Sequence, residues 1–185
     1  NANYDQMTQE IAQAIRWTKE NIKNYGGNSE MIFVTGHSAG GHLVALATLN
    51  PIYKVPPNTV SGIILNAAAG LDMKHYLENY PPTDENDYLK TWTANPDEWK
   101  NASPIYFLDA EIPPFLIYIG EKTYPSLKVG NDRFLRELNK NQKSVSTILV
   151  NKGHLPMVLQ YFWPWSDRYK EIYDFMNKAS FITDK

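Results

Sequence analysis

Five residues, from Gly36 to Gly40 (GHSAG), have the types and the spacing that nucleophilic catalysis needs. The apolar run over 31–35 predicts a buried strand before them, and 41–49 predicts a helix after them. Strand, sharp turn and helix in that order lift the serine of a Gly-x-Ser-x-Gly motif above the edge of a sheet. We expect Gly36 and Gly40 to keep side chains away from the point where strand and helix meet. The Ser38 hydroxyl is then expected at a helix N-terminus, where backbone amides stabilise negative charge.

A serine hydroxyl is a weak nucleophile, so it needs a nearby base, and that base needs an orienting group. His154 follows the last predicted strand. Both His154 and Ser38 therefore leave the carboxyl ends of parallel strands, where α/β sheets place their sites. We expect His154 to take the Ser38 proton during attack and to return it to the leaving group. The amide of Ala39 is the expected oxyanion donor. This chemistry requires no cofactor and no metal ion.

Hydrophobic periodicity predicts alternating strands and helices around these residues. We expect strands over 31–35, 60–66, 115–119 and 145–150, and helices over 5–24, 41–49, 131–140 and 166–178. Continuous apolar strands are buried on both faces, which predicts a mostly parallel sheet with flanking helices in a single α/β domain over 1–185. Residues 71–112 break the rhythm with Pro81-Pro82, an acidic loop and many aromatic side chains. We interpret them as a small, aromatic-rich, cap-like insertion.

The bulk composition narrows the function further. The net charge of −2 gives no indication of a nucleic-acid partner or of an anionic membrane surface. The chain has no cysteine, which excludes disulfides and thiolate metal sites. No apolar run is long enough for a membrane span. These numbers do not decide whether the protein is cytoplasmic or exported, or whether it forms a homo-oligomer.

The segment from Gly36 to His42 (GHSAGGH) resembles the nucleophile elbow of α/β-hydrolase-fold carboxylesterases. Within these it is similar to the hormone-sensitive-lipase-like group, with its feruloyl-esterase-like and kynurenine-formamidase-like branch. Residues 15–28, 102–105 and Gly153-His154 extend the resemblance to most of the chain outside 71–101. It implies hydrolysis of a small-molecule carboxylic ester through an acyl-enzyme. An aryl-formamide amidase of the same fold and a non-catalytic hydrolase-fold binding protein remain as alternatives.

The chain departs from that family at the catalytic acid. The family usually has Gly-Asp-x-Asp after the penultimate strand, and its second aspartate is catalytic. Here the segment is Gly-Glu-Lys-Thr, with Thr123 in the place of that aspartate. A threonine can hydrogen-bond an imidazole but cannot carry the charge that stabilises imidazolium. We predict Glu121 as the orienting carboxylate, with Asp72 or no acid at all as alternatives, and we expect Asp132 to cap a helix.

The family also carries a His-Gly-Gly oxyanion loop and further strands ahead of the first helix seen here. We favour the explanation that the chain is the carboxyl-terminal part of a longer protein. In the other explanation, a different loop or a second subunit supplies the second oxyanion donor and covers the sheet edge.

The aromatic run over 161–165 (YFWPW) follows His154 closely. It is expected either to pack the insertion onto the sheet or to line an acyl or aryl pocket. The aromatic insertion favours a small or aromatic group in the substrate over a long lipid.

Overall fold

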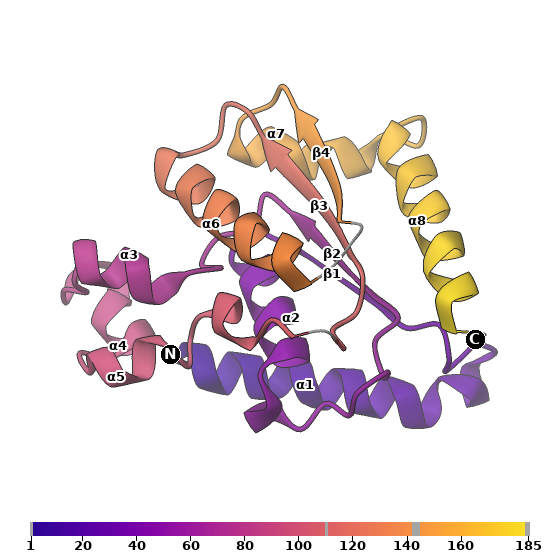
Figure 1. Ribbon diagram of the computed structural model, residues 1–185, viewed down its shortest axis with the longest axis horizontal. Helices are drawn as coiled ribbons and strands as arrows, with labels where there is room; N and C mark the ends of the chain where they lie inside the picture. Colours follow the sequence, from indigo (N-terminus) through magenta and orange to yellow (C-terminus); the bar gives the residue numbers. More distant parts are fainter. Residues whose placement is uncertain (1, 110, 142–144, 184–185) are drawn as a thin grey trace.

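Four parallel strands form the centre of the molecule. The computed structural model describes residues 2–109, 111–141 and 145–183 (Figure 1). The strands pair in chain order, β1-β2-β3-β4, and every pairing is parallel. Their bounds are Phe33–His37 for β1, Gly62–Asn66 for β2, Phe115–Gly120 for β3 and Ser146–Val150 for β4. The predicted parallel sheet is confirmed, although β1 begins two residues later than the apolar run over 31–35 indicated.

Helices cover both faces of this sheet. They are α1 (Tyr4–Asn21), α2 (Ala39–Leu49), α6 (Pro125–Asn141), α7 (His154–Leu159) and α8 (Asp167–Thr183). Each crossover advances by one strand in the same direction, so the right-handed rule places the crossover helices α2 and α6 on one face. They share a hydrophobic core with α1 and with Ile63, Leu65 and Ile117. The alternate residues Ile64 and Leu116 face the opposite side, where Met157 of α7 and Phe175 of α8 cover them.

Several helix boundaries differ from the sequence prediction, most of all at the start of α6 and the end of α1. Helix α6 begins at Pro125 and not at residue 131. Proline is well suited to the first turn of a helix, and Gly130 lies inside α6. Asp132 is therefore an interior residue that pairs with Arg136, and the expectation that it caps a helix is wrong. Helix α1 ends at Asn21, and a 3₁₀ turn over Ile22–Tyr25 continues it.

Short helices occupy the segment between β2 and β3. They are α3 (Met73–Asn79), η3 (Glu85–Asp87), α4 (Tyr88–Trp92), α5 (Pro96–Trp99) and η4 (Pro104–Phe107). In Figure 1, α3, α4 and α5 lie together at one end of the molecule, near the start of α1. An ion pair fixes this group to α6, since Arg133 Nε lies 2.7 Å from the Asp72 carboxylate. Because the Asp72 side chain is only 1% exposed, this contact ties the segment between β2 and β3 firmly to α6.

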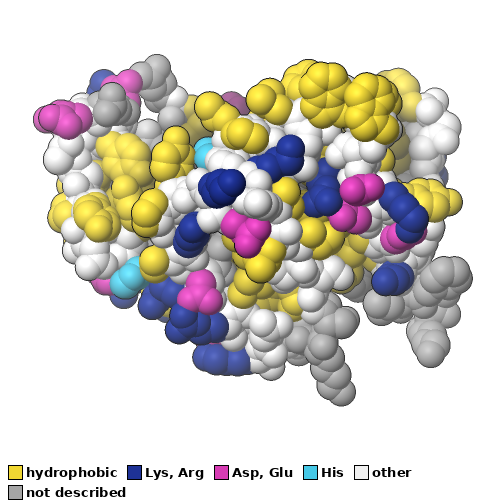
Figure 2. All heavy atoms as spheres, turned by 90° about the horizontal axis from the view of Figure 1, so that it is seen from above, with side chains coloured by type: hydrophobic (Ala, Val, Ile, Leu, Met, Phe, Trp, Pro, Cys, Tyr) yellow, Lys and Arg dark blue, Asp and Glu magenta, His cyan; other side chains and the backbone are white. Residues whose placement is uncertain are grey.

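The aromatic run over 161–165 lies on the surface. The side chains of Phe162 and Trp165 are 76% and 77% exposed. Figure 2 shows apolar side chains gathered along its upper margin, on the side where α7 lies in Figure 1. This exposure contradicts the interpretation that the run packs the insertion onto the sheet, whereas its role in lining a pocket stays a prediction. None of the helices in the described ranges is both long and apolar enough to cross a bilayer.

Candidate active site

The turn between β1 and α2 holds Ser38 in a strained backbone conformation. Its φ of 54° and ψ of −123° lie in a region that side-chain-bearing residues rarely adopt. Such a conformation costs about 1–3 kcal/mol, so surrounding contacts must enforce it. Two backbone hydrogen bonds do so here: Ser38 N–H donates to Asn66 O at 3.2 Å, and Ala69 N–H donates to Ser38 O at 3.0 Å. The end of β2 therefore fixes the serine at the edge of the sheet.

Two glycines make this tight turn possible, but only one of them was predicted. A Cβ on Gly36 would lie 2.3 Å from the carbonyl carbon and oxygen of Gly40. A Cβ on Gly41 would lie 2.7 Å from the Cβ of Ala68. A Cβ on Gly40 meets nothing within 4 Å. The expectation for Gly36 agrees with this geometry, whereas the steric role assigned to Gly40 is wrong and belongs to Gly41.

The imidazole of His154 lies in hydrogen-bond contact with the serine. His154 is the first residue of α7, which follows β4, and its Nε2 lies 2.8 Å from Ser38 Oγ. Its other nitrogen, Nδ1, lies 3.3 Å from Thr123 Oγ1. The fold thus aligns a hydroxyl, an imidazole and a second hydroxyl across the carboxyl ends of β1, β4 and β3.

Aromatic rings surround His154. The ring centroids of His154 and His37 are 4.7 Å apart, and Tyr124 lies 5.3 Å away. Burial lowers the pKa of His154, and the neighbouring His37 lowers it further. His37 Nδ1 lies 3.0 Å from Asn66 O, so that Nδ1–H donates to this carbonyl. Burial lowers the pKa of His37 as well, against the opposing effect of that hydrogen bond.

Sequence reasoning did not identify Asn66 or Tyr124 as neighbours of the site. Asn66 is the register partner of His37, at the end of β2. The carbonyl oxygen of Asn66 accepts hydrogen bonds from Ser38 N–H and His37 Nδ1–H. Its side-chain Nδ2 donates to Met157 O in α7 at 3.1 Å. The sequence did hold a signal for Asn66, because it is a polar residue at the end of an otherwise apolar strand.

In the described part of the chain, neither predicted carboxylate is a hydrogen-bond partner of the imidazole. The turn after β3 is tied to the end of β4, because Glu121 N–H donates to Val150 O at 2.8 Å and Lys122 N–H to Lys152 O at 3.1 Å. The Glu121 side chain is exposed, and within the described ranges no hydrogen bond joins its carboxylate to His154. Asp72 is held by Arg133 and accepts from His75 N–H at 3.2 Å. The role of Glu121 stays a prediction, while Thr123 is the residue in contact with Nδ1.

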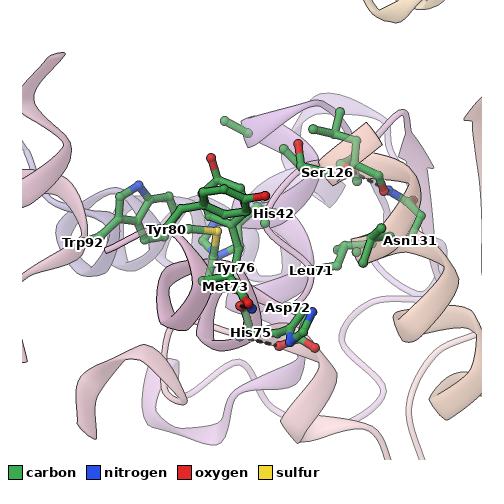
Figure 3. Close-up of a pocket in the computed structure, with 18 of the residues that line it drawn as sticks. His42, Leu71, Asp72, Met73, His75, Tyr76, Tyr80, Trp92, Ser126 and Asn131 are labelled. Carbon is green, nitrogen blue, oxygen red and sulfur yellow. Dashed lines mark hydrogen bonds between the residues drawn. The ribbon is translucent and has the colours of Figure 1, made fainter. Parts of the chain in front are cut away.

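A cavity of about 630 Å³ adjoins the nucleophile turn, where Ala39, the residue after Ser38, forms part of its wall. Figure 3 shows Tyr76, Tyr80 and Trp92 on one side of this cavity, and Ser126 and Asn131 of α6 on the other. The aromatic side comes entirely from the segment between β2 and β3. Such a cavity, with an aromatic side, further apolar residues and a few polar groups, is typical of small-molecule sites.

His42 forms the buried floor beneath these aromatic rings. Its Nε2 lies 2.7 Å from Ala102 O, and its ring packs edge-on against Trp92. Burial lowers the pKa of His42 to about 4, so this imidazole is neutral at neutral pH. His42 therefore has a structural role beside the nucleophile turn.

Comparison with known proteins places this geometry in a family. The family model described as BD-FAE matches residues 1–124. "Esterase LipQ" of Mycobacterium tuberculosis is 35% identical over an alignment of 123 positions that covers 61% of this chain and 29% of that protein. The chain thus spans less than a third of the length of that relative.

Solved structures share the fold. A "truncated form of carbohydrate esterase from gut microbiota" superposes with a TM-score of 0.76 and 23% identity, over 97% of this chain and 70% of that one. Esterase B from Lactobacillus rhamnosis gives a TM-score of 0.72 and 18% identity, over 98% of this chain and 62% of that one. The sequence resemblance to esterases of the α/β-hydrolase fold is confirmed at the level of fold and family. Because the family model covers more than half of its residues, the chain belongs to the BD-FAE family.

Proposed function

We propose that the chain hydrolyses a carboxylic ester of a small molecule through an acyl-enzyme, with Ser38 as nucleophile and His154 as general base. The observation that carries this proposal is the 2.8 Å contact between Ser38 Oγ and His154 Nε2 at a serine with φ of 54°. A serine held in a strained turn and aimed at an imidazole is the arrangement that activates a hydroxyl. The relatives named as esterases support the same reaction class.

The reaction follows from these contacts. Ser38 Oγ attacks the ester carbonyl carbon as its proton passes to His154 Nε2, and the carbonyl electrons move to the oxygen. The C–O bond to the alcohol then breaks, and the departing oxygen takes the proton from Nε2. Water, deprotonated by His154, attacks the acyl carbon and releases the acid and Ser38.

The oxyanion formed in each half of the reaction needs hydrogen-bond donors. Ala39 is the first residue of α2, so its N–H has no partner within the helix. We therefore assign Ala39 N–H as an oxyanion donor next to the nucleophile. An amide so placed lowers the barrier by about 3 kcal/mol.

The cavity beside Ala39 is the proposed site for one side of the ester. Its aromatic walls favour a small or aromatic group. Residues 71–112 supply that aromatic wall, and we propose that they act as a cap on the site. No cofactor or metal ion takes part in the proposed chemistry.

A fluorophosphonate probe tests the proposal directly, because it reacts only with an activated serine. We expect one adduct per chain, on the peptide that contains Ser38, and none in Ser38→Ala. Hydrolysis of 4-nitrophenyl acetate should fall at least about a thousandfold in that variant. Circular dichroism of both proteins provides the control for folding.

The same experiment decides between the proposal and its alternatives. A folded wild-type protein without an adduct contradicts the proposal and favours a non-catalytic binding protein. An adduct on Ser38 together with faster hydrolysis of an aryl formamide than of the matching aryl ester would instead favour an amidase.

A further inference from the structure

The proton on His154 can occupy either of two nitrogens, and only one arrangement is productive. To accept the proton of Ser38, Nε2 must carry a lone pair, and Nδ1 must carry the hydrogen. Nδ1–H then donates to Thr123 Oγ1, 3.3 Å away. In the other tautomer, Nε2–H points at Ser38 Oγ and the imidazole cannot act as a base. The partner of Nδ1 therefore influences how much of the enzyme is ready to react.

A threonine hydroxyl can partner either tautomer. It accepts from Nδ1–H in the productive form, and it donates its own O–H to Nδ1 in the other form. An ionised carboxylate accepts only, so it would stabilise the productive tautomer and the imidazolium that follows. In the part of the chain that the structure describes, Thr123 is the hydrogen-bond partner of Nδ1.

The position of Thr123 is fixed independently of His154. Its side chain is buried, and its N–H donates to Gly120 O at 3.2 Å. The backbone bonds from Glu121 and Lys122 to β4 and its following loop hold the same turn against the segment that leads to His154. The hydroxyl is therefore a built part of the site and not a mobile side chain near it.

We propose that Thr123 is the positioning residue of His154, and that its hydroxyl leaves the resting enzyme divided between a productive and an unproductive imidazole tautomer. This inference rests on the proposed serine hydrolase function. Turnover is then limited by the fraction of His154 that carries its hydrogen on Nδ1. An acceptor-only side chain of similar size at residue 123 removes that limit.

Three substitutions at this position test the proposal with 4-nitrophenyl acetate as substrate. Thr123→Asp should raise kcat about tenfold with little change in KM, because a carboxylate favours the productive tautomer, stabilises the imidazolium that follows and does not act on substrate binding. Thr123→Val removes the hydrogen bond and should lower kcat about five- to tenfold. Thr123→Ser keeps the hydroxyl and should restore the wild-type kcat. Thr18→Val, on the outer side of α1, is a matched control.

The pH profile adds a readout that a merely structural role would not change. The titratable side chains that contact His154 are those of His37 and Tyr124. The charged residues on the two flanking turns, all exposed, are Glu121, Lys122 and Lys152. A carboxylate at residue 123 favours imidazolium, so Thr123→Asp should shift the acid limb of kcat/KM to higher pH. Thr123→Val introduces no charge, so its acid limb should not show this shift to higher pH.

The tautomer itself is measured by ¹⁵N NMR of the imidazole, which does not depend on activity. We expect a mixture in the wild type and hydrogen on Nδ1 in Thr123→Asp. Unchanged tautomer populations and unchanged kcat in Thr123→Val and Thr123→Asp would overturn the proposal. A larger loss in Glu121→Gln than in Thr123→Val would overturn it too and give the role to Glu121. If the wild type neither hydrolyses the ester nor forms an adduct, the hydrolase function has failed, and the NMR result still decides the role of Thr123.

Discussion

The imidazole of His154 has mostly uncharged neighbours. A hydroxyl lies on Nδ1, and the rings of His37 and Tyr124 lie against it. Burial raises the cost of the charged imidazolium, and His37 raises it further. A base with a lowered pKa is a weaker proton acceptor, but it stays neutral at lower pH. The pH range of activity is therefore set at this residue.

That range can be predicted with its sign. His154 acts as a base only when neutral, so the rate falls as the pH drops through its lowered pKa. We expect the acid limb of kcat/KM to have its midpoint below 6.5, the ordinary pKa of histidine. His37→Phe keeps a ring but removes the second titratable group, so the midpoint should move up while remaining below 6.5, because burial is the larger cause.

The matched control for that shift is His75→Phe, which removes a histidine that does not contact His154. Its midpoint should equal that of the wild type. A wild-type midpoint at or above 6.5, or equal shifts in the two variants, would show that His37 does not affect the base.

At the scale of elements, the site depends on how closely β1 and α2 approach each other. Gly36 is in β1, Gly40 and Gly41 are in α2, and the two elements meet within one turn. This close approach orients the Ser38 hydroxyl toward α7, which carries His154. Asn66, at the end of β2, accepts a hydrogen bond from His37 of β1 and donates one to Met157 of α7. These bonds join β2 to the elements that carry Ser38 and His154.

Paired alanine substitutions test this packing. Gly36→Ala places a Cβ 2.3 Å from backbone atoms that cannot move away, so we expect a loss of about 3 kcal/mol or more in the free energy of unfolding. Gly40→Ala meets no atom within 4 Å and lies in a helix, so it should stabilise the protein by about 0.5–1 kcal/mol. Urea unfolding monitored by circular dichroism measures both. Similar destabilisation by both alanines would contradict the packing described here.

The elements were largely predictable because apolar runs and their spacing are local. The sequence placed Ser38 and His154 after strands, and parallel strands bring such residues to one edge. The partner of Nδ1 was not predictable in the same way. The choice between Glu121 and Thr123 depends on backbone hydrogen bonds from the turn to β4, which are contacts between segments distant in sequence. The exposure of the aromatic run over 161–165 depends likewise on the path of the chain after α7.

At the scale of the whole molecule, two separate parts of the chain enclose the cavity. The short helices between β2 and β3 form one wall, and α6 forms the other. The ion pair between Asp72 and Arg133 joins the two parts at a buried carboxylate. The width of the cavity is therefore set by tertiary packing, and its aromatic wall can be altered without touching Ser38 or His154.

Tyr80 is the residue of choice for such a change. It lines the cavity and packs against Tyr76 with ring centroids 5.2 Å apart, yet it is 64% exposed and so contributes little to the core. If the cavity holds the acyl group, Tyr80→Ala removes an aromatic contact worth about 0.5–1.5 kcal/mol. KM for 4-nitrophenyl benzoate should then rise about two- to tenfold with kcat unchanged, while KM for 4-nitrophenyl acetate stays constant. Tyr173→Ala on α8, at the same exposed fraction of 64%, should change neither value. Equal effects on the benzoate and the acetate would instead mean that the aromatic wall does not contact the acyl group.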